Sequence, residues 1–539
     1  MNQNKVKVGV ILDCLQIKKW QLEALDNILD IAAIDIILNC TNTTNPRNYF
    51  KNFIYYVINI MWMKVPYTKN IKFDPGIIPV RNFSSNYEGS WQLIPAEVTQ
   101  EVGSKNLDFI IRFGMNLILN PDDLNAKYGV VSYHHGDPDY YRGRPPGYYE
   151  TINNSDCIGI IVQKLSNKID GGLIYEKKYS KIYKHSYRRT SNNLYKNSIT
   201  LLKKAINNCL LGQTIVNTAN GKLYSLPNNY NAFLFIQSQF LRGFKRILKG
   251  LFLEKKWNIA ITKNAINFEG CETEIILNLD DAQSPKLLDK YSFYADPFFS
   301  LNSEGVYFEG LSKFSGCGEI LYAPTSNLNK ASLILKGGHL SYPQVIQMDD
   351  RECLLPEMCF VSSPRLYSID GKVCKSDLDL KFEFEADLRC VDLTNFYWEG
   401  SYYIFTSILG SEDDTLHLYH SENLLGPYVG HMASPIVIDP RSARMAGNIF
   451  SVENRIFRMG QNCSHEYGSS IKIFEIKTLN LLNYKESEIK EIFVSNGFGP
   501  HTINFKDGEV LYDYYFNKLD FFAGARRALA LLYRRGEVE

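Results

Sequence analysis

Close cysteine pairs are missing from this sequence of 539 residues. Its 11 cysteines are scattered along the chain, and Cys317, for example, stands alone between serine and glycine residues. Metal sites and disulfide frameworks both need cysteines at characteristic spacings. The pattern therefore predicts reduced thiols in a cytoplasmic protein, with neither a disulfide framework nor a metal site.

Long apolar runs, an excess of one charge and phosphate-binding loops are also missing. The apolar run from Phe53 to Met63 is too short to span a bilayer, and Lys5 to Leu12 is predicted to be a first strand rather than a signal peptide. A formal charge of +1 gives no overall attraction to a membrane or to nucleic acid, so no nucleic-acid partner is expected. Neither common glycine-rich phosphate loop occurs, which leaves nucleotide-triphosphate chemistry without support.

What is present is typical of a soluble, multidomain protein. Hydrophobic residues make up 45% and charged residues 22% of the chain, and its length predicts two or three domains. We expect an α/β open-sheet domain at 1–185, a helical connector at 186–256, an all-β domain at 257–518 and a basic helical tail at 519–539. The sequence leaves the oligomeric state open.

Side chains capable of acid–base chemistry follow two predicted strands of the first domain. Tyr128–Ser132 and Ile158–Gln163 are expected strands, and His134 and Asp170 lie just beyond apolar runs. Ligands of open α/β sheets bind at the carboxyl ends of the strands. A lone histidine is often structural, but the strand order and the Gly-Pro-rich loop favour a proton-handling pair at His134 and Asp170.

Residues 5–180 resemble the folate-dependent formyltransferases. His134 falls on the family histidine, and Asp170 in Ile169-Asp170-Gly171-Gly172 falls on its aspartate. Ser132 stands where the family has a catalytic asparagine. A serine hydroxyl can still donate a hydrogen bond, although losing an oxyanion donor typically slows a reaction by ~10²–10³. His135 could take up part of the role.

The resemblance also implies a donor and an acceptor. The donor would be 10-formyltetrahydrofolate, with its pterin near Arg112, Phe113, Gly114 and Met115 and near Asn167 and Ile169. The acceptor would be the amino group of a small molecule or glycan, most plausibly an amino sugar of a cell-surface glycan or its precursor. Arg142 and Arg144 could clamp a phosphate or carboxylate of that acceptor, or belong to a solvated loop.

Five segments recur from Trp257 onward with a period of ~50 residues, in the range of propeller blades. They begin near Ala295, Leu340, Cys390, Arg444 and Gly499, and polar turns with aromatic runs follow several of them. This alternation is typical of hairpins, and four strands in each repeat would make a blade. The sequence therefore predicts a five-bladed β-propeller.

Residues 257–515 resemble the propellers of glycoside hydrolase family 43 and, more closely, the N-terminal domain of plant glucosamine inositolphosphorylceramide transferases. The matching motifs include His339-Leu340-Ser341-Tyr342-Pro343 and Arg441-Ser442-Ala443-Arg444-Met445-Ala446-Gly447. In such hydrolases three carboxylates line a central funnel, and Asp296, Glu357 and Asp392 could converge there. They would serve glycosidic hydrolysis, passive sugar binding or the capping of turns. Arg444 and His501, at the matching place in later repeats, suit an anionic ligand.

Two basic amphipathic stretches complete the pattern. Gln237–Lys256 alternates apolar residues with lysine and arginine, and Phe521–Arg535 repeats the arrangement. Such helices bind membrane surfaces or pack on a neighbouring domain. Peripheral contact with the inner membrane face is therefore one possible partner interaction of a cytoplasmic protein.

Together these patterns predict an N-formyltransferase whose propeller holds a carbohydrate-bearing acceptor. Two alternatives remain: a glycan-binding protein with an inactive formyltransferase domain, and a propeller enzyme acting as, or beside, a glycoside hydrolase or glycosyltransferase.

Overall fold

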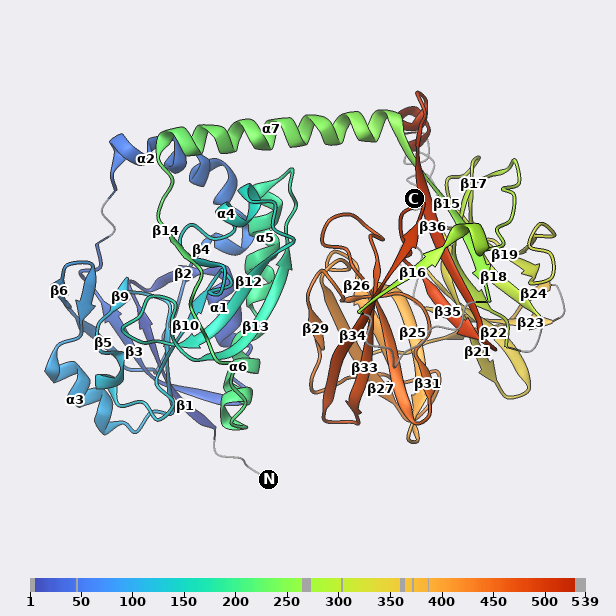
Figure 1. Ribbon diagram of the computed structural model, residues 1–539. Coiled ribbons are helices and arrows are strands. Elements are labelled where there is room, and N and C mark those ends of the chain that lie inside the picture. Colours follow the sequence, from blue (N-terminus) through green and yellow to red (C-terminus); the bar gives the residue numbers. More distant parts are fainter. Residues whose placement is uncertain are drawn as a thin grey trace. The chain divides into compact units, whose positions relative to one another are not determined.

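The computed structural model describes residues 5–44, 47–263, 273–301, 304–358, 364–370, 373–385 and 387–528. The chain divides into two compact units, Met1–Phe244 (unit 1) and Lys245–Glu539 (unit 2). Figure 1 shows that unit 1 combines helices with a sheet, whereas strands dominate unit 2. The predicted tail residues 529–539, including Arg534 and Arg535, lie outside the described residues.

Unit 1 is built on a seven-stranded sheet with the order β13-β12-β10-β8-β1-β3-β5. Strands β5, β3, β1, β8 and β10 run parallel, and β12 pairs antiparallel with β10 and β13. The strands are β1 (Val6–Leu12), β3 (Ala32–Cys40), β5 (Val80–Phe83), β8 (Phe109–Arg112), β10 (Val130–His134), β12 (Cys157–Lys164) and β13 (Ile174–Lys181). The predicted α/β sheet is confirmed, because buried apolar strands of this kind need helices on their faces.

Six α-helices lie in the described part of unit 1, and a seventh, α7, begins there and continues past Phe244 into unit 2. They are α1 (Lys19–Asp26), α2 (Tyr49–Ile58), α3 (Ala96–Ser104), α4 (Tyr148–Ile152), α5 (Tyr187–Ser198), α6 (Leu201–Leu210) and α7 (Asn229–Phe252). Ser186 caps α5 by accepting a hydrogen bond from the backbone of Arg189. Helix α6 buries Leu201, Leu202, Ala205 and Ile206 and packs on β13 and β12. These helices, predicted to form a connector, are therefore part of unit 1.

The second predicted connector helix was placed too far along the chain. Helix α7 begins at Asn229 and ends at Phe252, so Lys255 and Lys256 lie in strand β15 (Leu253–Thr262). Strand β15 pairs with β36 (Glu509–Leu519) over its whole length. Long-range strand pairing of this kind overrides a helical pattern that local sequence favours.

The described residues of unit 2 form five β-sheets, whose first strands follow one another along the chain. Sheet 1 is β17 (Tyr291–Phe299), β18 (Gly305–Ser312), β19 (Gly318–Pro324) and β20 (Ser332–Leu335). Sheet 2 is β21 (Ser341–Met348), β22 (Arg351–Glu357), β23 (Arg365–Asp370) and β24 (Val373–Lys381). Sheet 3 is β25 (Cys390–Trp398), β26 (Ser401–Ile408), β27 (Thr415–Ser421), β28 (Val429–Gly430) and β29 (Val437–Ile438).

The last two sheets combine strands from the start and the end of unit 2. Sheet 4 is β30 (Arg444–Met445), β31 (Phe450–Val452), β32 (Arg455–Gln461), β33 (Ile471–Leu479), β34 (Tyr484–Ser495) and β16 (Glu274–Asn278). Sheet 5 is β35 (Ile503–Lys506), β36 and β15. The hairpins predicted from polar turns with aromatic runs are confirmed by the antiparallel pairs β17–β18, β25–β26 and β35–β36.

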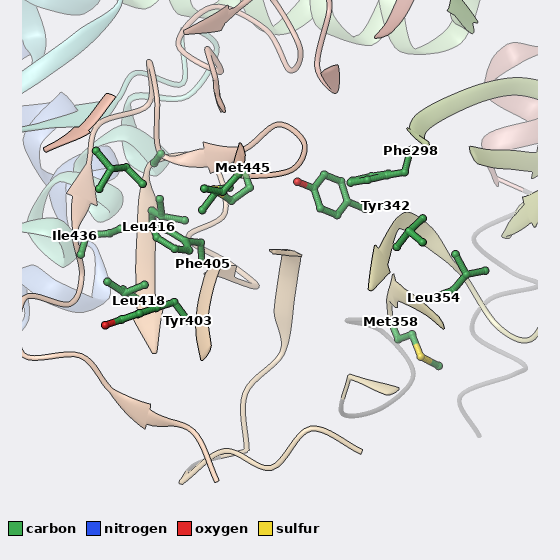
Figure 2. Close-up of a cluster of buried hydrophobic side chains, with 14 of the residues drawn as sticks. Phe298, Tyr342, Leu354, Met358, Tyr403, Phe405, Leu416, Leu418, Ile436 and Met445 are labelled. Carbon is green, nitrogen blue, oxygen red and sulfur yellow. The ribbon is translucent and has the colours of Figure 1, made fainter. Parts of the chain in front are cut away.

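The first strands of the five sheets touch one another in sequence. Strand β17 contacts both β21 and β35, and β25 contacts both β21 and β30. The backbone N–H of Ile503 donates to the carbonyl of Ala446, which links sheets 5 and 4. Apolar side chains fill the spaces between the sheets, among them Phe298, Tyr342 and Met445 (Figure 2). Residues from distant repeats therefore meet at the ends of these first strands.

Candidate functional site

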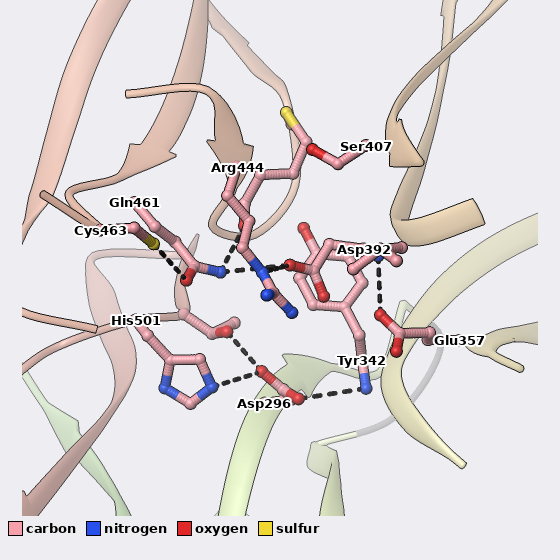
Figure 3. Close-up of polar contacts among 12 residues, drawn as sticks. Asp296, Tyr342, Glu357, Asp392, Ser407, Arg444, Gln461, Cys463 and His501 are labelled. Carbon is pink, nitrogen blue, oxygen red and sulfur yellow. Dashed lines mark hydrogen bonds and ion pairs between the residues drawn. The ribbon is translucent and has the colours of Figure 1, made fainter. Parts of the chain in front are cut away.

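A cavity of about 290 Å³ lies among these first strands. All five side chains predicted to bind a ligand in the second domain line it: Asp296, Glu357, Asp392, Arg444 and His501. Figure 3 shows them facing one another from different sheets. The structure thus brings together residues that lie up to about 200 positions apart in the sequence.

A repeated backbone irregularity positions two of these carboxylates. Asp296, Tyr342 and Asp392 occupy matching places in sheets 1 to 3, and their φ angles are +49°, +45° and +49°. The strand register shifts at each place, between 295 and 298, 341 and 344, and 391 and 394. Left-handed backbone in non-glycine residues is uncommon and marks a bulge that re-aims a side chain. Here it turns Asp296 and Asp392 toward the cavity.

His501 joins two buried carboxylates. Its Nε2 lies 3.0 Å from Asp296 Oδ1, and its Nδ1 lies 2.8 Å from Asp513 Oδ2. Asp513 also accepts hydrogen bonds from the backbone N–H groups of Asp296, His501 and Thr502. Burial alone would lower the pKa of His501, but Asp513 and Asp296 outweigh burial and raise it to about 10. His501 is therefore an imidazolium at neutral pH.

The same contacts keep Asp296 ionised. Thr502 Oγ1 donates to Asp296 Oδ1 at 2.6 Å, and the backbone N–H of Tyr342 donates to Oδ2 at 3.3 Å. Burial opposes ionisation, yet His501 and Thr502 hold the pKa of Asp296 below its usual value. A carboxylate with donors on both oxygens accepts further hydrogen bonds from hydroxyl groups of a ligand.

Glu357 is held in the opposite protonation state. Burial and then the charge of Asp392 raise the pKa of Glu357 to about 8, and Arg444 offsets this only in part. Glu357 Oε2 accepts the backbone N–H of Asp392 at 2.8 Å. At neutral pH the carboxyl group of Glu357 is therefore mostly a neutral acid that can donate a proton or a hydrogen bond.

Arg444 neutralises Asp392. The Arg444 guanidinium donates to Asp392 Oδ2, and the side-chain amide of Gln461 reaches the same oxygen at 3.3 Å. Arg444 also lies over the ring of Tyr467, 4.7 Å from its centroid. Trp257 and Tyr467 pack against His501, with ring centroids 4.2 and 5.0 Å away. The cavity thus combines aromatic walls with carboxylates and a paired guanidinium.

Three of these groups have the chemistry of metal ligands. Among the described residues, the ligand atoms of Asp296, His501 and Asp513 lie within 4.8 Å of one another. Both ring nitrogens of His501 face carboxylates, and its raised pKa keeps both protonated. The imidazolium itself supplies the positive charge between the carboxylates.

The predicted pair in unit 1 is also formed. His134 Nδ1 lies 3.2 Å from Asp170 Oδ1, and the N–H of Gly143 donates to Asp170 Oδ2 at 2.8 Å. His134 Nε2 lies 3.2 Å from the carbonyl oxygen of Tyr141. Strand β11 (Tyr141–Gly143) therefore covers the histidine, and the cavity beside it measures only about 10 Å³.

The hydroxyl group of Ser132 already accepts a hydrogen bond from a neighbouring side chain. It is buried, and Arg112 Nη1 donates to its Oγ at 2.9 Å. The remaining donors of Arg112 reach the carbonyl oxygens of Gly114, Met115 and Asn116. The Arg112 side chain thus braces the loop after β8, and its charge lies beside the serine.

His135 lies directly after β10 and lines the same small cavity as His134, so its share in the catalytic role stays a prediction. Its Nε2 lies 3.0 Å from Ser198 Oγ, and its ring packs against Trp20 and Tyr195. Burial lowers the pKa of His135 to about 3, so the ring stays neutral.

The other residues predicted for unit 1 hold loops together. Arg142 Nε donates to Gly221 O at 2.8 Å and its Nη1 to Ile169 O at 3.4 Å, so the loop is not merely solvated. Arg144 lines the small cavity beside His134.

The ring of Phe113 packs against Trp20 and Tyr133, whereas Met115 is buried. Asn167 exchanges hydrogen bonds with Asn120. At Gly114 the chain passes so close to Asp13 that a side chain would collide with its backbone.

Sequence reasoning missed Asp513, Thr502, Gln461 and Tyr467. Asp513 carried a usable signal, since it is a single acidic residue inside the aromatic strand Leu511-Tyr512-Asp513-Tyr514-Tyr515. A buried charge in such a strand requires partners. The other three carry no pattern of their own.

The family model for the N-terminal region of glucosamine inositolphosphorylceramide transferase 1 matches residues 282–505, which lie within unit 2. The rice (Oryza sativa subsp. japonica) protein of that name is 28% identical over 209 residues, covering 36% of this chain and 28% of the relative. The Arabidopsis thaliana protein is 26% identical over 230 residues, covering 40% of this chain and 29% of the relative. The chain therefore spans less than a third of the length of these relatives.

Solved structures resemble parts of this chain only distantly. A 4-N formyltransferase from Francisella tularensis is 15% identical, with a TM-score of 0.27 over 41% of this chain and 76% of that one. An alpha-L-arabinofuranosidase from Lactobacillus brevis is 16% identical, with a TM-score of 0.31 over 42% of this chain and 85% of that one. Both scores lie below the level at which a shared fold is inferred. The predicted similarity of unit 2 to the plant transferase domain is confirmed over residues 282–505.

Proposed function

We propose that unit 2 is a five-bladed β-propeller that binds a carbohydrate in the cavity between Asp296 and Glu357. The observation that carries this proposal is the opposite protonation of these two groups in one cavity of about 290 Å³. An ionised carboxylate accepts hydrogen bonds from sugar hydroxyls, and a neutral carboxyl group donates one. The aromatic rings of Trp257 and Tyr467 supply the apolar wall that ligand sites use.

The same pair of groups also permits chemistry on a glycosidic bond. Glycoside hydrolysis needs one carboxylic acid to protonate the leaving oxygen and one carboxylate on the other side of the bond. Glu357 would be the acid and Asp296 the carboxylate. The similarity of residues 282–505 to a domain of glycan-modifying transferases supports a sugar ligand in either case.

Isothermal titration calorimetry with glucosamine, N-acetylglucosamine and arabinose tests the proposal. We expect saturable binding of at least one sugar, weakened about tenfold or more in Asp296→Asn and in Glu357→Gln, because each loses a hydrogen bond to a charged or buried group. Glu422→Gln, an exposed position of unit 2, is the matched control. Equal binding in all four proteins, or none at millimolar sugar, contradicts the proposal. Release of reducing sugar from an oligosaccharide would assign hydrolysis.

The pairing of His134 with Asp170 favours a second function, N-formyl transfer by unit 1. In that reaction the neutral amine of an amino sugar attacks the formyl carbon of 10-formyltetrahydrofolate. A C–N bond to the acceptor forms, the bond to the donor nitrogen breaks, and a proton passes from the amine to that nitrogen. His134 would relay the proton, and Asp170 would orient the imidazole and stabilise its charged form.

Formyl transfer requires strand β11 to move in this structure. Tyr141 covers His134, and about 10 Å³ beside it cannot hold a pterin or a sugar. Calorimetry with a stable 10-formyltetrahydrofolate analogue tests this function, with His134→Ala and Asp170→Asn beside the unaltered chain. Binding that weakens in Asp170→Asn supports formyl transfer. No binding at millimolar analogue favours a carbohydrate-binding protein with an inactive transferase-like unit.

A further inference from the structure

The second half of helix α7 leaves a row of large apolar side chains exposed. Ala232, Phe235 and Gln239 are the buried residues of the helix, and all of them lie in the N-terminal half. Beyond them the large apolar side chains are exposed: Phe240 by 72%, Phe244 by 52% and Ile247 by 61%. An ordinary surface helix buries such side chains against its own protein.

The second half of α7 separates apolar from basic residues. With about 100° between successive residues, its apolar side chains fall within an arc of about 120°. These residues are Phe240, Leu241, Phe244, Ile247, Leu248 and Leu251. Four basic residues lie on the opposite side of the helix: Arg242, Lys245, Arg246 and Lys249. The segment 229–253 contains no aspartate or glutamate.

Within unit 2 the chain after β36 enlarges this apolar surface. Leu519, Phe521 and Phe522 are 60%, 73% and 71% exposed. Phe521 packs on Phe252 with ring centroids 6.1 Å apart, and Arg527 donates to the carbonyl oxygens of Gly250 and Leu253. We call the unit 2 part of this surface the apolar face; it consists of Ile247, Leu248, Leu251, Leu519, Phe521 and Phe522.

Positive charge borders the apolar face. The acidic residues nearby are already engaged in ion pairs, Glu466 with Lys249, and Glu254 and Asp520 with Arg526. Lys245 and Lys518 form no ion pair with any described residue, and Arg527 donates to the backbone carbonyl oxygens of Gly250 and Leu253. The border therefore has a net positive charge, although the whole chain has a formal charge of only +1.

We propose that the apolar face and its basic border bind the surface of a bilayer that contains anionic lipids. Helices with a polar basic side and a side rich in phenylalanine and leucine lie in the plane of a membrane, with the apolar side in the acyl boundary. Each basic residue near an anionic leaflet adds electrostatic attraction. A second copy of the chain would bring two basic borders together, and like charges at an interface oppose association. No described helix is long and apolar enough to cross the membrane.

Co-sedimentation of the full chain with vesicles tests the proposal. One set of vesicles contains phosphatidylcholine alone, and the other contains phosphatidylcholine with phosphatidylglycerol at the same total lipid. We expect the chain to sediment with the anionic vesicles and much less with the neutral ones, and added salt to reduce the binding. Absence of binding to anionic vesicles overturns the proposal.

Variants separate this surface from nonspecific adhesion. Ile247→Glu/Leu248→Glu should weaken vesicle binding more than tenfold, because two side chains that enter the acyl boundary become charged. Leu482→Glu is the matched control, since Leu482 is 66% exposed in the turn between β33 and β34 of the same unit. Lys245→Gln/Lys518→Gln should weaken binding to the anionic vesicles only. Ile247→Glu/Leu248→Glu and Leu482→Glu should both unfold at the same temperature as the unaltered chain, because the substituted positions are exposed.

Two further results would contradict the proposal. Equal vesicle binding by Ile247→Glu/Leu248→Glu and Leu482→Glu would show that the apolar face does not enter the bilayer. A dimer in light scattering that Ile247→Glu/Leu248→Glu splits, without vesicle binding by the dimer, would show that a second copy covers the face instead.

Discussion

Asp296 and Glu357 line the same cavity, and their surroundings push their pKa values in opposite directions. The imidazolium of His501 and the hydroxyl of Thr502 favour the charged form of Asp296. Burial and the charge of Asp392 favour the neutral form of Glu357. Two carboxyl groups with separated pKa values are a common arrangement in sites that transfer protons. The stability of unit 2 should therefore depend on pH in ways that single substitutions can assign.

Glu357→Gln should remove one pH dependence of stability. The pKa of Glu357 is about 8 in the fold against an ordinary value of 4.5, so the folded chain holds this proton more tightly than the unfolded chain. Its contribution is fully present below pH 4.5 and is lost as pH rises toward 8, by ~1.4 kcal/mol for each pH unit. We expect Glu357→Gln to gain stability relative to the unaltered chain over this range. Urea unfolding of both proteins between pH 5 and pH 8 measures this gain. A difference in unfolding free energy that stays constant with pH would show that Glu357 is already ionised.

His501→Asn should destabilise unit 2 and flatten its alkaline pH dependence. The pKa of His501 is raised from 6.5 to about 10, so its stabilising contribution is present below pH 6.5 and is lost as pH rises through 10. Without the imidazolium, Asp296 and Asp513 are left as buried charges, and breaking such a buried pair costs about 3–5 kcal/mol. Denaturant unfolding at pH 7 and pH 9 measures both effects. His420→Asn in β27 is the control. If it lowered the free energy of unfolding as much as His501→Asn does, His501 would have no special role.

The positions of Asp296 and Asp392 could be predicted because each lies in a recurring segment of the sequence, and Glu357 was predicted from the family resemblance. Their protonation states could not be predicted from the sequence, because they depend on His501, Asp513 and Arg444, which belong to other sheets. Lys255 and Lys256 were misplaced in a helix because strand β15 is fixed by its distant partner β36.

The sheet of unit 1 was predictable from apolar runs, whereas the covering of its site was not. The pair His134 and Asp170 follows from strand order. The carbonyl of Tyr141 above His134 and the guanidinium of Arg112 on Ser132 depend on where loops settle after folding. Loop positions of this kind follow from tertiary contacts that no local pattern records.

Tyr342→Phe should destabilise unit 2 without altering its cavity. The buried hydroxyl of Tyr342 accepts the N–H of Gly447 at 2.8 Å, lies 3.0 Å from Thr394 Oγ1 and donates to the carbonyl of Gly447 at 3.0 Å. It thus joins sheets 2, 3 and 4. Removing it leaves buried backbone groups without a partner, which costs about 1–3 kcal/mol. Tyr397→Phe, at an exposed position of sheet 3, should change the unfolding free energy by less than about 0.5 kcal/mol. Equal unfolding free energies of Tyr342→Phe and the unaltered chain would show that water replaces the hydroxyl group of Tyr342.

Arg444→Gln should raise the pKa of Glu357 and lower the stability of unit 2 together. Arg444 pairs with the buried Asp392, and its positive charge is the influence that opposes the raised pKa of Glu357. Without it, Glu357 should stay protonated at a higher pH, and Asp392 should lose its charged partner while keeping the contact to the amide of Gln461. Carboxyl carbon NMR titration, with Glu357→Gln to assign the signal, measures the first effect. Denaturant unfolding measures the second.

Arg444→Lys distinguishes charge from geometry at this position. Lysine keeps the positive charge but lacks the planar donor group that lies over Tyr467 and reaches Asp392. We expect Arg444→Lys to leave the pKa of Glu357 near that of the unaltered chain while losing part of the stability. If Arg444→Gln leaves the titration of Glu357 unchanged, then burial and Asp392 alone set its pKa, and the cavity does not rely on Arg444 to balance its acids.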